Sequence, residues 1–470
     1  MSAKTGRVSI IDATLREGTQ APGARFSPEQ SAEIARYLVY IGVDMIECGH
    51  PLVSSGEMAR VQKVVNLGLP VPVLVHARAR EEDVFAASRS GAKWVGIFCG
   101  INDISRRIRL VGYSVDQVLD RIRSSISYAR TLGLKVRYTL EDASRTSWDL
   151  TVQAFRCAVE AGANRICFAD SVGKEEPEEL RHLIFKLRQE FAQLDLEVHL
   201  HDDRGLAMAN ALAAIEVGAN WISTSVNSLG ERSGIVDISV LLANLHYRGM
   251  RRMVHTEALQ DLSRYVAACA RASVDDRRPV IGENAFTHEA RLHTRAVEVD
   301  EIAYSWLAPG EVGRRTRIAR KKLPTHVEDL IIKPVAIPAT ELRYHREGPG
   351  TRYVMIDERF VPDCRQYCIV RYVPSQQSGA AEHVDAHSHW VDSLFLFLGH
   401  RPDLTGLEVE VRLGDRKFPV SSPASVFIPA SLTHSYRIIE GSGLYVNHVL
   451  AGSYNESLLE PYPWNSLKAQ

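Results

Sequence analysis

The sequence has no apolar run long enough to cross a lipid bilayer and no secretion signal at its N-terminus. Its net charge is only −1, so it has no excess of one sign that would hold nucleic acid or an anionic membrane surface. Its seven cysteines form no Cys-x-x-Cys pair, and several lie in apolar runs, as small core residues of a reduced compartment do. We therefore expect a cytoplasmic protein that acts on small molecules, with no nucleic-acid or membrane partner.

A repeated order of apolar strand, helix and glycine turn runs through residues 8–250. Strands are expected at residues 8–15, 45–48, 71–76, 94–99, 135–140, 165–169, 197–201 and 221–226. Glycines such as Gly42 and Gly162 stand between a helical pattern and the next strand, as helix C-caps do. Eight strand–helix units are the size of a (β/α)8 TIM barrel. No Gly-x-Gly-x-x-Gly turn follows the first strand, which disfavours an open dinucleotide-binding sheet.

The chain is too long for one ordinary core, and its pattern changes after the expected barrel. Residues 253–325 have a helical pattern followed by a basic linker. From residue 326, short alternating strands are separated by Gly, Pro and Asp turns, which is typical of an all-β sandwich or small barrel. The predicted fold class is α/β, with a TIM barrel at 1–252, a helical subdomain and linker at 253–325, and an all-β domain at 326–470.

Charged and polar side chains stand where two of the expected strands end. Arg16 and Glu17 follow the first strand, and His199 and His201 end the seventh. Alternate residues of a strand share a face, so the two imidazoles point the same way. Active sites of TIM barrels lie at this end of the strands, where two imidazoles and a carboxylate indicate a divalent-metal site. The alternative is a pair of core histidines.

The fifth strand carries a second polar set, in which Arg137, Thr139 and Glu141 share a face. An inward arginine is costly to desolvate unless it meets an anion, and a substrate carboxylate fits its bidentate geometry. The alternative is an internal ion pair between Arg137 and Glu141. Ser171, at the end of the sixth strand, could supply a hydroxyl to the same site.

Five segments resemble, in order, the motifs of the homocitrate synthase and 2-isopropylmalate synthase family. These segments are Thr14-Leu15-Arg16-Glu17-Gly18-x-Gln20, Glu141-Asp142-Ala143-Ser144-Arg145, His199-x-His201-Asp202, Gly230-Glu231-Arg232-x-Gly234 and Gly282-Glu283-Asn284-Ala285-Phe286-x-His288-Glu289. The likeness covers about residues 8–315. It implies a metal-dependent TIM barrel that condenses an acyl-CoA with a 2-oxo acid.

The resemblance also implies roles for individual residues. Arg16 would polarise the 2-oxo carbonyl and stabilise the developing alkoxide. The other implied residues are the metal ligands Glu17, His199 and His201, the proton-transfer residues Glu141, His293 and Tyr304, and the substrate contacts Arg137, Thr139, Ser171, Arg80 and Gln20. The implied metal is a divalent ion such as Zn, Mn or Mg, and acetyl-CoA is the implied co-substrate. In the family His293 and Tyr304 reach into the partner's barrel, so we expect a homodimer with exchanged helical subdomains.

The expected reaction is a Claisen-type condensation of acetyl-CoA with an anionic 2-oxo acid, giving a homocitrate-like 2-hydroxy acid and CoA. Arg80 and Arg137 make the expected pocket cationic, which disfavours a branched apolar acid. One alternative is a phosphonopyruvate-using synthase of a specialised pathway. Another is a metal-dependent C–C lyase of the hydroxymethylglutaryl-CoA lyase type. Such lyases carry a catalytic cysteine in the loop after the eighth strand, and residues 227–234 contain none.

The all-β domain has its own histidines. His387-Ser388-His389 and a later His434 resemble the two motifs of cupins, which are small β-barrels that often bind a metal. The position of the usual cupin glutamate is Ser393, with Asp392 beside it. The resemblance implies a second metal site at His387, His389 and His434. The alternative is a metal-free barrel that serves dimerisation or regulation.

Overall fold

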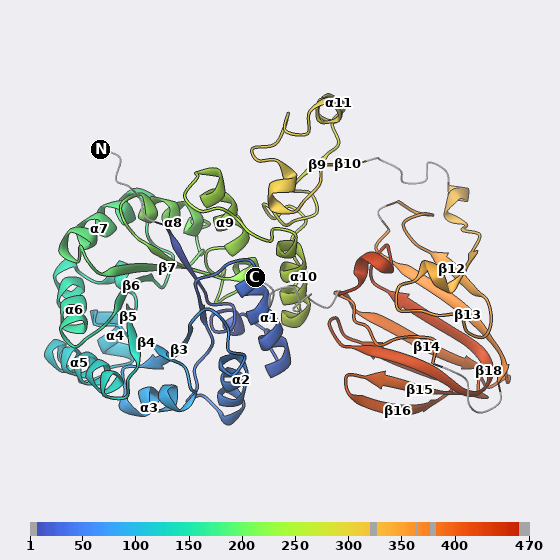
Figure 1. Ribbon diagram of the computed structural model, residues 1–470, viewed down its shortest axis with the longest axis horizontal. Coiled ribbons are helices and arrows are strands. Elements are labelled where there is room, and N and C mark those ends of the chain that lie inside the picture. Colours follow the sequence, from blue (N-terminus) through green and yellow to red (C-terminus); the bar gives the residue numbers. More distant parts are fainter. Residues whose placement is uncertain (1–6, 320–326, 363, 377–381, 460–470) are drawn as a thin grey trace. The chain divides into compact units, whose positions relative to one another are not determined.

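The computed structural model describes residues 7–319, 327–362, 364–376 and 382–459 (Figure 1). The chain divides into two compact units, residues 1–318 and 319–470. The barrel and the segment after it belong to the first unit, so the separate helical subdomain at 253–325 stays a prediction. None of the described helices is both long and apolar enough to span a membrane.

The first unit contains a closed barrel of eight parallel strands in which β8 pairs with β1. The strands are β1 Ser9–Asp12, β2 Met45–Glu47, β3 Val73–Arg78, β4 Trp94–Cys99, β5 Lys135–Leu140, β6 Arg165–Asp170, β7 Asp195–Leu200 and β8 Trp221–Thr224. All eight expected strands are present, and the TIM barrel is confirmed.

Helices surround the barrel strands, as Figure 1 shows. They are α1 Pro28–Tyr40, α2 Ser55–Val65, α3 Glu81–Arg89, α4 Asp103–Ile108, α5 Val115–Thr131, α6 Trp148–Glu160, α7 Pro177–Glu190, α8 Ala207–Glu216 and α9 Ile238–Tyr247. Ser27 and Gln30 form a capping box at the start of α1. Gly42 and Gly162 have φ values of 88° and 103°, a left-handed conformation that lets the chain turn from a helix into the next strand.

The first strand is shorter than expected, because the prediction of residues 8–15 is wrong at its end. β1 stops at Asp12, whose Oδ1 accepts a hydrogen bond from Thr14 N (2.9 Å). The Arg16 and Glu17 backbone N–H groups then both donate to Ala13 O. This tight turn, rather than a continued strand, carries the Arg16 and Glu17 side chains to the C-terminal end of the barrel.

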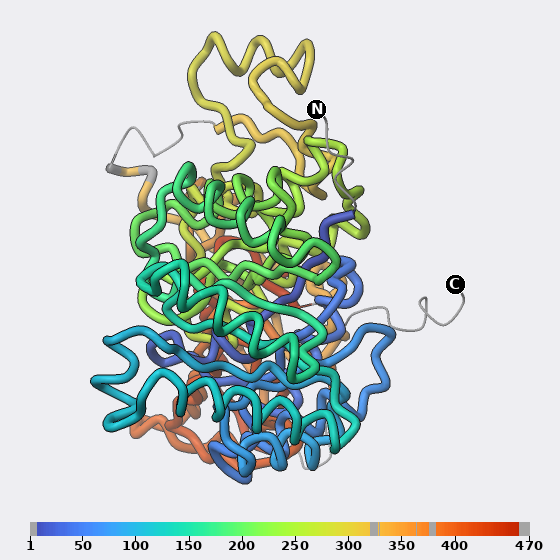
Figure 2. The backbone as a smooth tube through the Cα atoms, turned by 90° about the vertical axis from the view of Figure 1, so that its left-hand side faces the viewer, coloured from blue at the N-terminus to red at the C-terminus, as the bar shows by residue number. Residues whose placement is uncertain are grey.

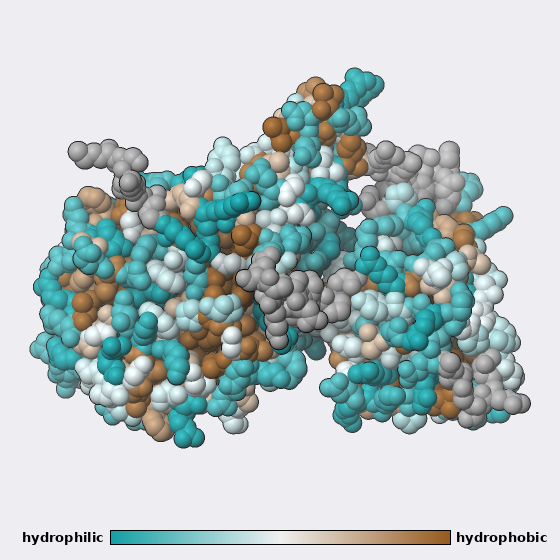
Figure 3. All heavy atoms as spheres, in the orientation of Figure 1, coloured by the Kyte–Doolittle hydropathy of each residue, from teal (hydrophilic) through white to brown (hydrophobic). Residues whose placement is uncertain are grey.

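The segment after the barrel begins with α10 Ala258–Ala270, which packs on α1. It continues through β9 Thr287–His288, α11 Arg291–Val299 and β10 Arg317–Ile318, with β9 and β10 paired in parallel. The part that carries α11 projects beyond the barrel (Figures 1 and 2). It exposes the large side chains of Leu292, Val299, Ile302, Tyr304 and Trp306. Figure 3 shows brown, hydrophobic atoms on this projecting part.

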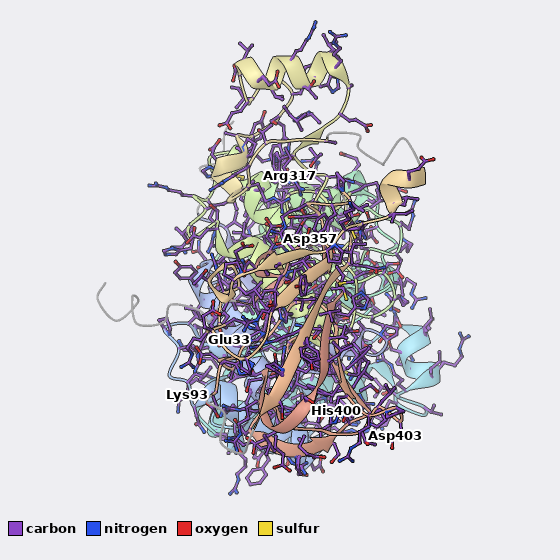
Figure 4. All side chains as sticks on the ribbon, turned by 90° about the vertical axis from the view of Figure 1, so that its right-hand side faces the viewer. Glu33, Lys93, Arg317, Asp357, His400 and Asp403 are labelled. Carbon is purple, nitrogen blue, oxygen red and sulfur yellow. The ribbon has the colours of Figure 1, made fainter. Side chains whose placement is uncertain are left out.

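The second unit is an antiparallel sheet structure with the strand order β11-β12-β13-β18-β14-β17, in which β15 pairs with β18 and β16. The strands are β11 Val335–Ile337, β12 Arg352–Ile356, β13 Tyr367–Gln376, β14 Ser393–Gly399, β15 Leu407–Leu413, β16 Arg416–Ser421, β17 Ala424–Ile428 and β18 His434–Val449. Alternate residues such as Phe395 and Phe397 fill its core. Asp357 and His400 mark opposite ends of the strands in Figure 4. The all-β character is confirmed, and the assignment to the cupins stays a prediction.

Candidate active site and a second histidine cluster

Glu17, His199 and His201 come together at the C-terminal end of the barrel strands, with potential ligand atoms that all lie within 4.8 Å of one another. His199 Nε2 is 3.8 Å from Glu17 Oε2, and His201 Nε2 is 3.9 Å from Glu17 Oε1. His199 lies in β7, and His201 follows it in a bridge to Ile235. All three side chains are buried. Their convergence is the arrangement that a divalent metal requires.

The protonation states suit a metal as well. His199 Nδ1 is hydrogen-bonded to Ser223 Oγ (2.8 Å), and His199 Nε2 faces the cluster. Burial, followed by the charge of Arg16, lowers the pKa of His199 to about 3, and burial also lowers the pKa of His201. Burial opposes ionisation of Glu17, but Arg16 and the imidazoles outweigh it and lower the pKa of this carboxyl. Two neutral imidazoles and one carboxylate fit a divalent ion.

Five buried charged side chains alternate in sign through the barrel interior. Arg16 Nη2 lies 3.2 Å from Glu47 Oε2, and Arg137 Nη2 lies 3.0 Å from Glu47 Oε1. Arg137 Nη1 donates to Glu197 Oε1 at 2.9 Å, and Arg165 Nη1 donates to Glu197 Oε2 at 3.1 Å. Burial opposes ionisation of Glu47, but Arg137 and Arg16 outweigh it and hold its pKa well below the usual range. Arg16, which also bonds Glu17, is thus fixed beside the cluster.

Arg137 binds other partners than its sequence position suggested: it pairs with Glu47 and Glu197 of the protein. Its guanidinium is 2% exposed and is already bound by Glu47 and Glu197. The alternative of an ion pair with Glu141 is wrong, because Glu141 pairs with Arg109 instead. In this structure Arg137 neutralises two buried carboxylates, and its contact with a substrate carboxylate stays a prediction.

The remaining barrel residues lie at different depths. Thr139 is buried in β5, and Ser171 Oγ accepts a hydrogen bond from Asp142 N (2.9 Å). Gln20 is exposed after β1, and Arg80 is exposed at the start of α3. Both follow the C-terminal ends of barrel strands, where an incoming ligand can reach them.

His293 and Tyr304 lie next to each other, but they do not join the cluster of Glu17, His199 and His201. Their rings stack with centroids 3.9 Å apart and an interplanar angle of 25°. The other ring beside His293 is His288, from the same projecting segment, at 6.3 Å. Within the described part of the chain neither residue contacts Glu17, so a single chain leaves two of the three expected proton-transfer residues away from the metal site.

Four residues of the barrel interior were missed by sequence reasoning: Glu47, His76, Arg165 and Glu197. Glu47 ends β2 and is fully buried, and His76 Nδ1 in β3 lies 3.8 Å from Glu47 Oε1. Burial, followed by Arg16, holds the pKa of His76 well below its usual value. The available signal was a lone glutamate in the apolar run Met45-Ile46-Glu47, since a buried carboxylate needs a cationic partner.

The second unit holds another histidine cluster. The potential ligand atoms of His387, His389 and His434 lie within 4.8 Å of one another, and the three residues are buried. The Nδ1 atoms donate to Asp385 O (2.8 Å), Ser457 Oγ (2.7 Å) and Leu432 O (3.0 Å), respectively. The Nε2 atoms of His389 and His434 have no hydrogen-bond partner and face the cluster, whereas His387 Nε2 is hydrogen-bonded to the Tyr454 hydroxyl (2.7 Å). Burial lowers the pKa of all three imidazoles.

No carboxylate joins this cluster among the described residues. Asp392 Oδ1 accepts a hydrogen bond from Ala430 N (2.8 Å), which holds it in the loop. Ser393 is buried, and its Oγ has no hydrogen-bond partner. The second cluster is thus an all-imidazole donor set, unlike the first.

A closed parallel barrel with a carboxylate and two histidines at the C-terminal ends of its strands defines a metal-dependent TIM-barrel enzyme. The model of the HMGL-like family matches residues 7–266, more than half of the chain. The homocitrate synthase of Pyrococcus abyssi is 40% identical over 310 residues, which are 66% of this chain and 84% of that protein. The chain therefore belongs to the HMGL-like family.

Two further comparisons agree with this placement. The homocitrate synthase AksA of Methanopyrus kandleri is 36% identical over 358 residues, 75% of this chain and 90% of that protein. The crystal structure of hydroxymethylglutaryl-CoA lyase from Pseudomonas aeruginosa matches with a TM-score of 0.51 and 23% identity, over 57% of this chain and 94% of that one. The structural likeness shows the fold alone.

Proposed function

We propose that the chain condenses acetyl-CoA with an anionic 2-oxo acid to give a homocitrate-like 2-hydroxy acid and CoA. The observation that carries this proposal is Arg16 held beside Glu17, His199 and His201. The identity of 36–40% to homocitrate synthases supports it. A phosphonopyruvate-type acid is the alternative within the same reaction.

The buried groups divide the chemistry between them. A divalent Zn, Mn or Mg ion held by Glu17, His199 and His201 would make the 2-oxo carbonyl electrophilic. Arg16 adds fixed positive charge where the alkoxide develops, and Glu47 prevents its guanidinium from turning away. Arg80 at the rim favours an acid with a second negative group, with Gln20, Thr139 and Ser171 as further contacts.

The acetyl methyl group must lose a proton, and we assign this step to His293 with Tyr304 and Glu141. His293 and Tyr304 stack in a segment that projects from its own barrel. That segment exposes Leu292 at 71% and Trp306 at 49%, an apolar surface suited to a protein contact. We therefore assign His293 to the barrel of a second copy, in a homodimer with exchanged segments.

The second unit completes the proposal. We assign a further divalent ion to His387, His389 and His434 in a cupin-like barrel, supported by their converging Nε2 atoms. The seven cysteines are free, and five of them are buried. This suits a reduced, cytoplasmic compartment.

The function is tested with the purified chain, metal, acetyl-CoA and a panel of 2-oxo acids, by following thiol release. We expect thiol release with an oxo-dicarboxylate or phosphonopyruvate, and about 100-fold less with Arg16→Met. Arg25→Met, at an exposed arginine, is the matched control. Absence of thiol release with every acid would overturn the proposal. Acetoacetate formed from hydroxymethylglutaryl-CoA would support the lyase alternative.

The exchanged segment has a separate test. His199→Ala and His293→Ala variants are each expected to be inactive, and mixing them after reversible dissociation should restore activity. One site of a mixed dimer then combines an intact metal cluster with an intact His293, so roughly a quarter of wild-type activity is expected. No recovery, in mixtures shown to contain mixed dimers, would mean that His293 does not act across the interface.

A further inference from the structure

Tyr454 lies against the histidine cluster of the second unit. This tyrosine is 2% exposed, and its hydroxyl oxygen is 2.7 Å from His387 Nε2. Its ring also packs edge-on against the ring of His389, with the ring centroids 4.9 Å apart. A potential oxygen ligand therefore lies beside two of the three clustered imidazoles.

The turn that carries Tyr454 also supports His389. Tyr454 precedes the short 3-10 helix η7 Asn455–Ser457, and Ser457 Oγ is hydrogen-bonded to His389 Nδ1 (2.7 Å). His389 also forms a backbone bridge with Leu458. The Tyr454 side chain is thus fixed relative to the cluster by backbone contacts of its own segment.

The hydrogen bonds around Tyr454 define the position of its proton. His387 Nδ1 lies 2.8 Å from the carbonyl oxygen of Asp385, so this nitrogen is the donor and His387 Nε2 carries a lone pair. The Tyr454 hydroxyl therefore donates to His387 Nε2, and its oxygen accepts a hydrogen bond from His345 Nε2 (2.7 Å). The hydroxyl proton occupies the lone pair that a metal ion at the cluster would take.

A metal ion can replace this proton with little movement of the side chains. Two ligand atoms of a tetrahedral ion lie about 3.3 Å apart when each is about 2.0 Å from the ion. The Tyr454 oxygen and His387 Nε2, now 2.7 Å apart, would need to separate by only ~0.6 Å. His345 Nε2 would still donate to the oxygen, and such a hydrogen bond stabilises a metal-bound anion.

The charge of the cluster favours an anionic ligand. His387, His389 and His434 are neutral donors, and no carboxylate joins them in the part of the chain that the structure describes. A divalent ion held by these imidazoles alone would keep its full charge in a buried site, which is costly. A phenolate at Tyr454 would remove part of that charge.

We propose that Tyr454 is the fourth ligand of the metal in the second unit, bound through its phenolate oxygen. This role rests on the divalent ion proposed above for His387, His389 and His434. On binding, the O–H bond of Tyr454 breaks, its oxygen bonds to the ion, and the proton passes to the solvent. The ion is then held by one anionic and three neutral ligands.

Copper(II) is a suitable probe, because imidazoles bind it well and a copper-bound phenolate gives a visible charge-transfer absorption. The full chain is titrated with copper(II), and the visible absorption and the bound copper are measured. We expect the absorption in wild type and in His199→Ala, which lacks a ligand of the barrel cluster. Tyr454→Phe should lose the absorption and bind copper in the second unit about tenfold more weakly or worse. Tyr367→Phe is the matched control, at a buried tyrosine whose ring centroid is 5.5 Å from that of Tyr454, and should keep the absorption.

A further variant, His389→Ala, distinguishes failure of the metal site from failure of the ligand. If His389→Ala binds as much copper as wild type, the cluster holds no metal, and both the metal and the role of Tyr454 are overturned. If His389→Ala loses copper but wild type shows no absorption, or Tyr454→Phe keeps it, the metal stands and the role of Tyr454 is overturned. Resonance Raman spectra of the wild-type chain guard against misfolding of Tyr454→Phe. Excitation into the absorption should enhance phenolate ring vibrations, and their absence would overturn the proposal.

Discussion

Arg137 in the barrel and Arg371 in the second unit are both fully buried arginines, 2% and 1% exposed. Arg137 is bound by two carboxylates, Glu47 and Glu197. Arg371 on β13 lies opposite another arginine, Arg352 on β12. The barrel thus carries its own counter-charges and holds its arginine in one position, while the second unit places two buried arginines opposite each other.

The two histidine clusters differ in the same way. Glu17 supplies negative charge to the barrel cluster, whereas the cluster of the second unit has imidazoles alone. A divalent ion in the barrel is partly neutralised by the protein and can still accept the anionic groups of a substrate. The same ion in the second unit would add to the positive charge of Arg352 and Arg371. Both differences give the interior of the second unit more uncompensated positive charge than the interior of the barrel.

The largest effect is expected from removing the paired arginine. Arg137→Met leaves Glu47 and Glu197 buried without one of their cations and should lower the free energy of unfolding by about 3–5 kcal/mol. Arg371→Met removes a buried charge that faces another arginine and should leave the chain equally stable or more stable. Thermal unfolding of both variants by calorimetry measures the contrast, with exposed Arg89→Met as the control. Equal destabilisation by the two substitutions would contradict it.

Short-range sequence patterns predicted the architecture of the protein well. Apolar runs and glycine turns predicted all eight barrel strands. The strand-end positions of His199 and His201 indicated a metal site, and the resemblance to the family motifs implied Glu17 as its carboxylate. The end of β1 was missed, since Asp12 starts a turn that continues through apolar residues. Alternation likewise predicted the all-β character of the second unit.

The charge network could not be predicted in the same way. Glu47 and Glu197 meet Arg137 only because the barrel closes and brings β2, β5 and β7 to one interior. Arg371 stood in the region predicted to be all-β, but only the pairing of β12 with β13 aligns it with Arg352. Partners across a closed sheet depend on the register of strands far apart in sequence, which no local pattern contains.

The buried carboxyl of Asp12 extends the comparison of buried charges to an acidic group. Its expected effect on stability is the smallest. It is fully buried, and burial raises its pKa from 3.8 to about 7, although Thr14 and Thr224 donate to it. A carboxyl can meet burial by keeping its proton, whereas an arginine cannot lose its own. Because the folded pKa is raised, the stabilisation is present below pH 4 and is lost as the pH rises through 7. Between pH 5 and pH 7 wild type should lose about 2 kcal/mol of stability relative to Asp12→Asn, which denaturant titration at several pH values can measure. A pH-independent difference between the two chains would show that Asp12 is ionised when buried, so that the barrel must hold an unpaired charge as the second unit does.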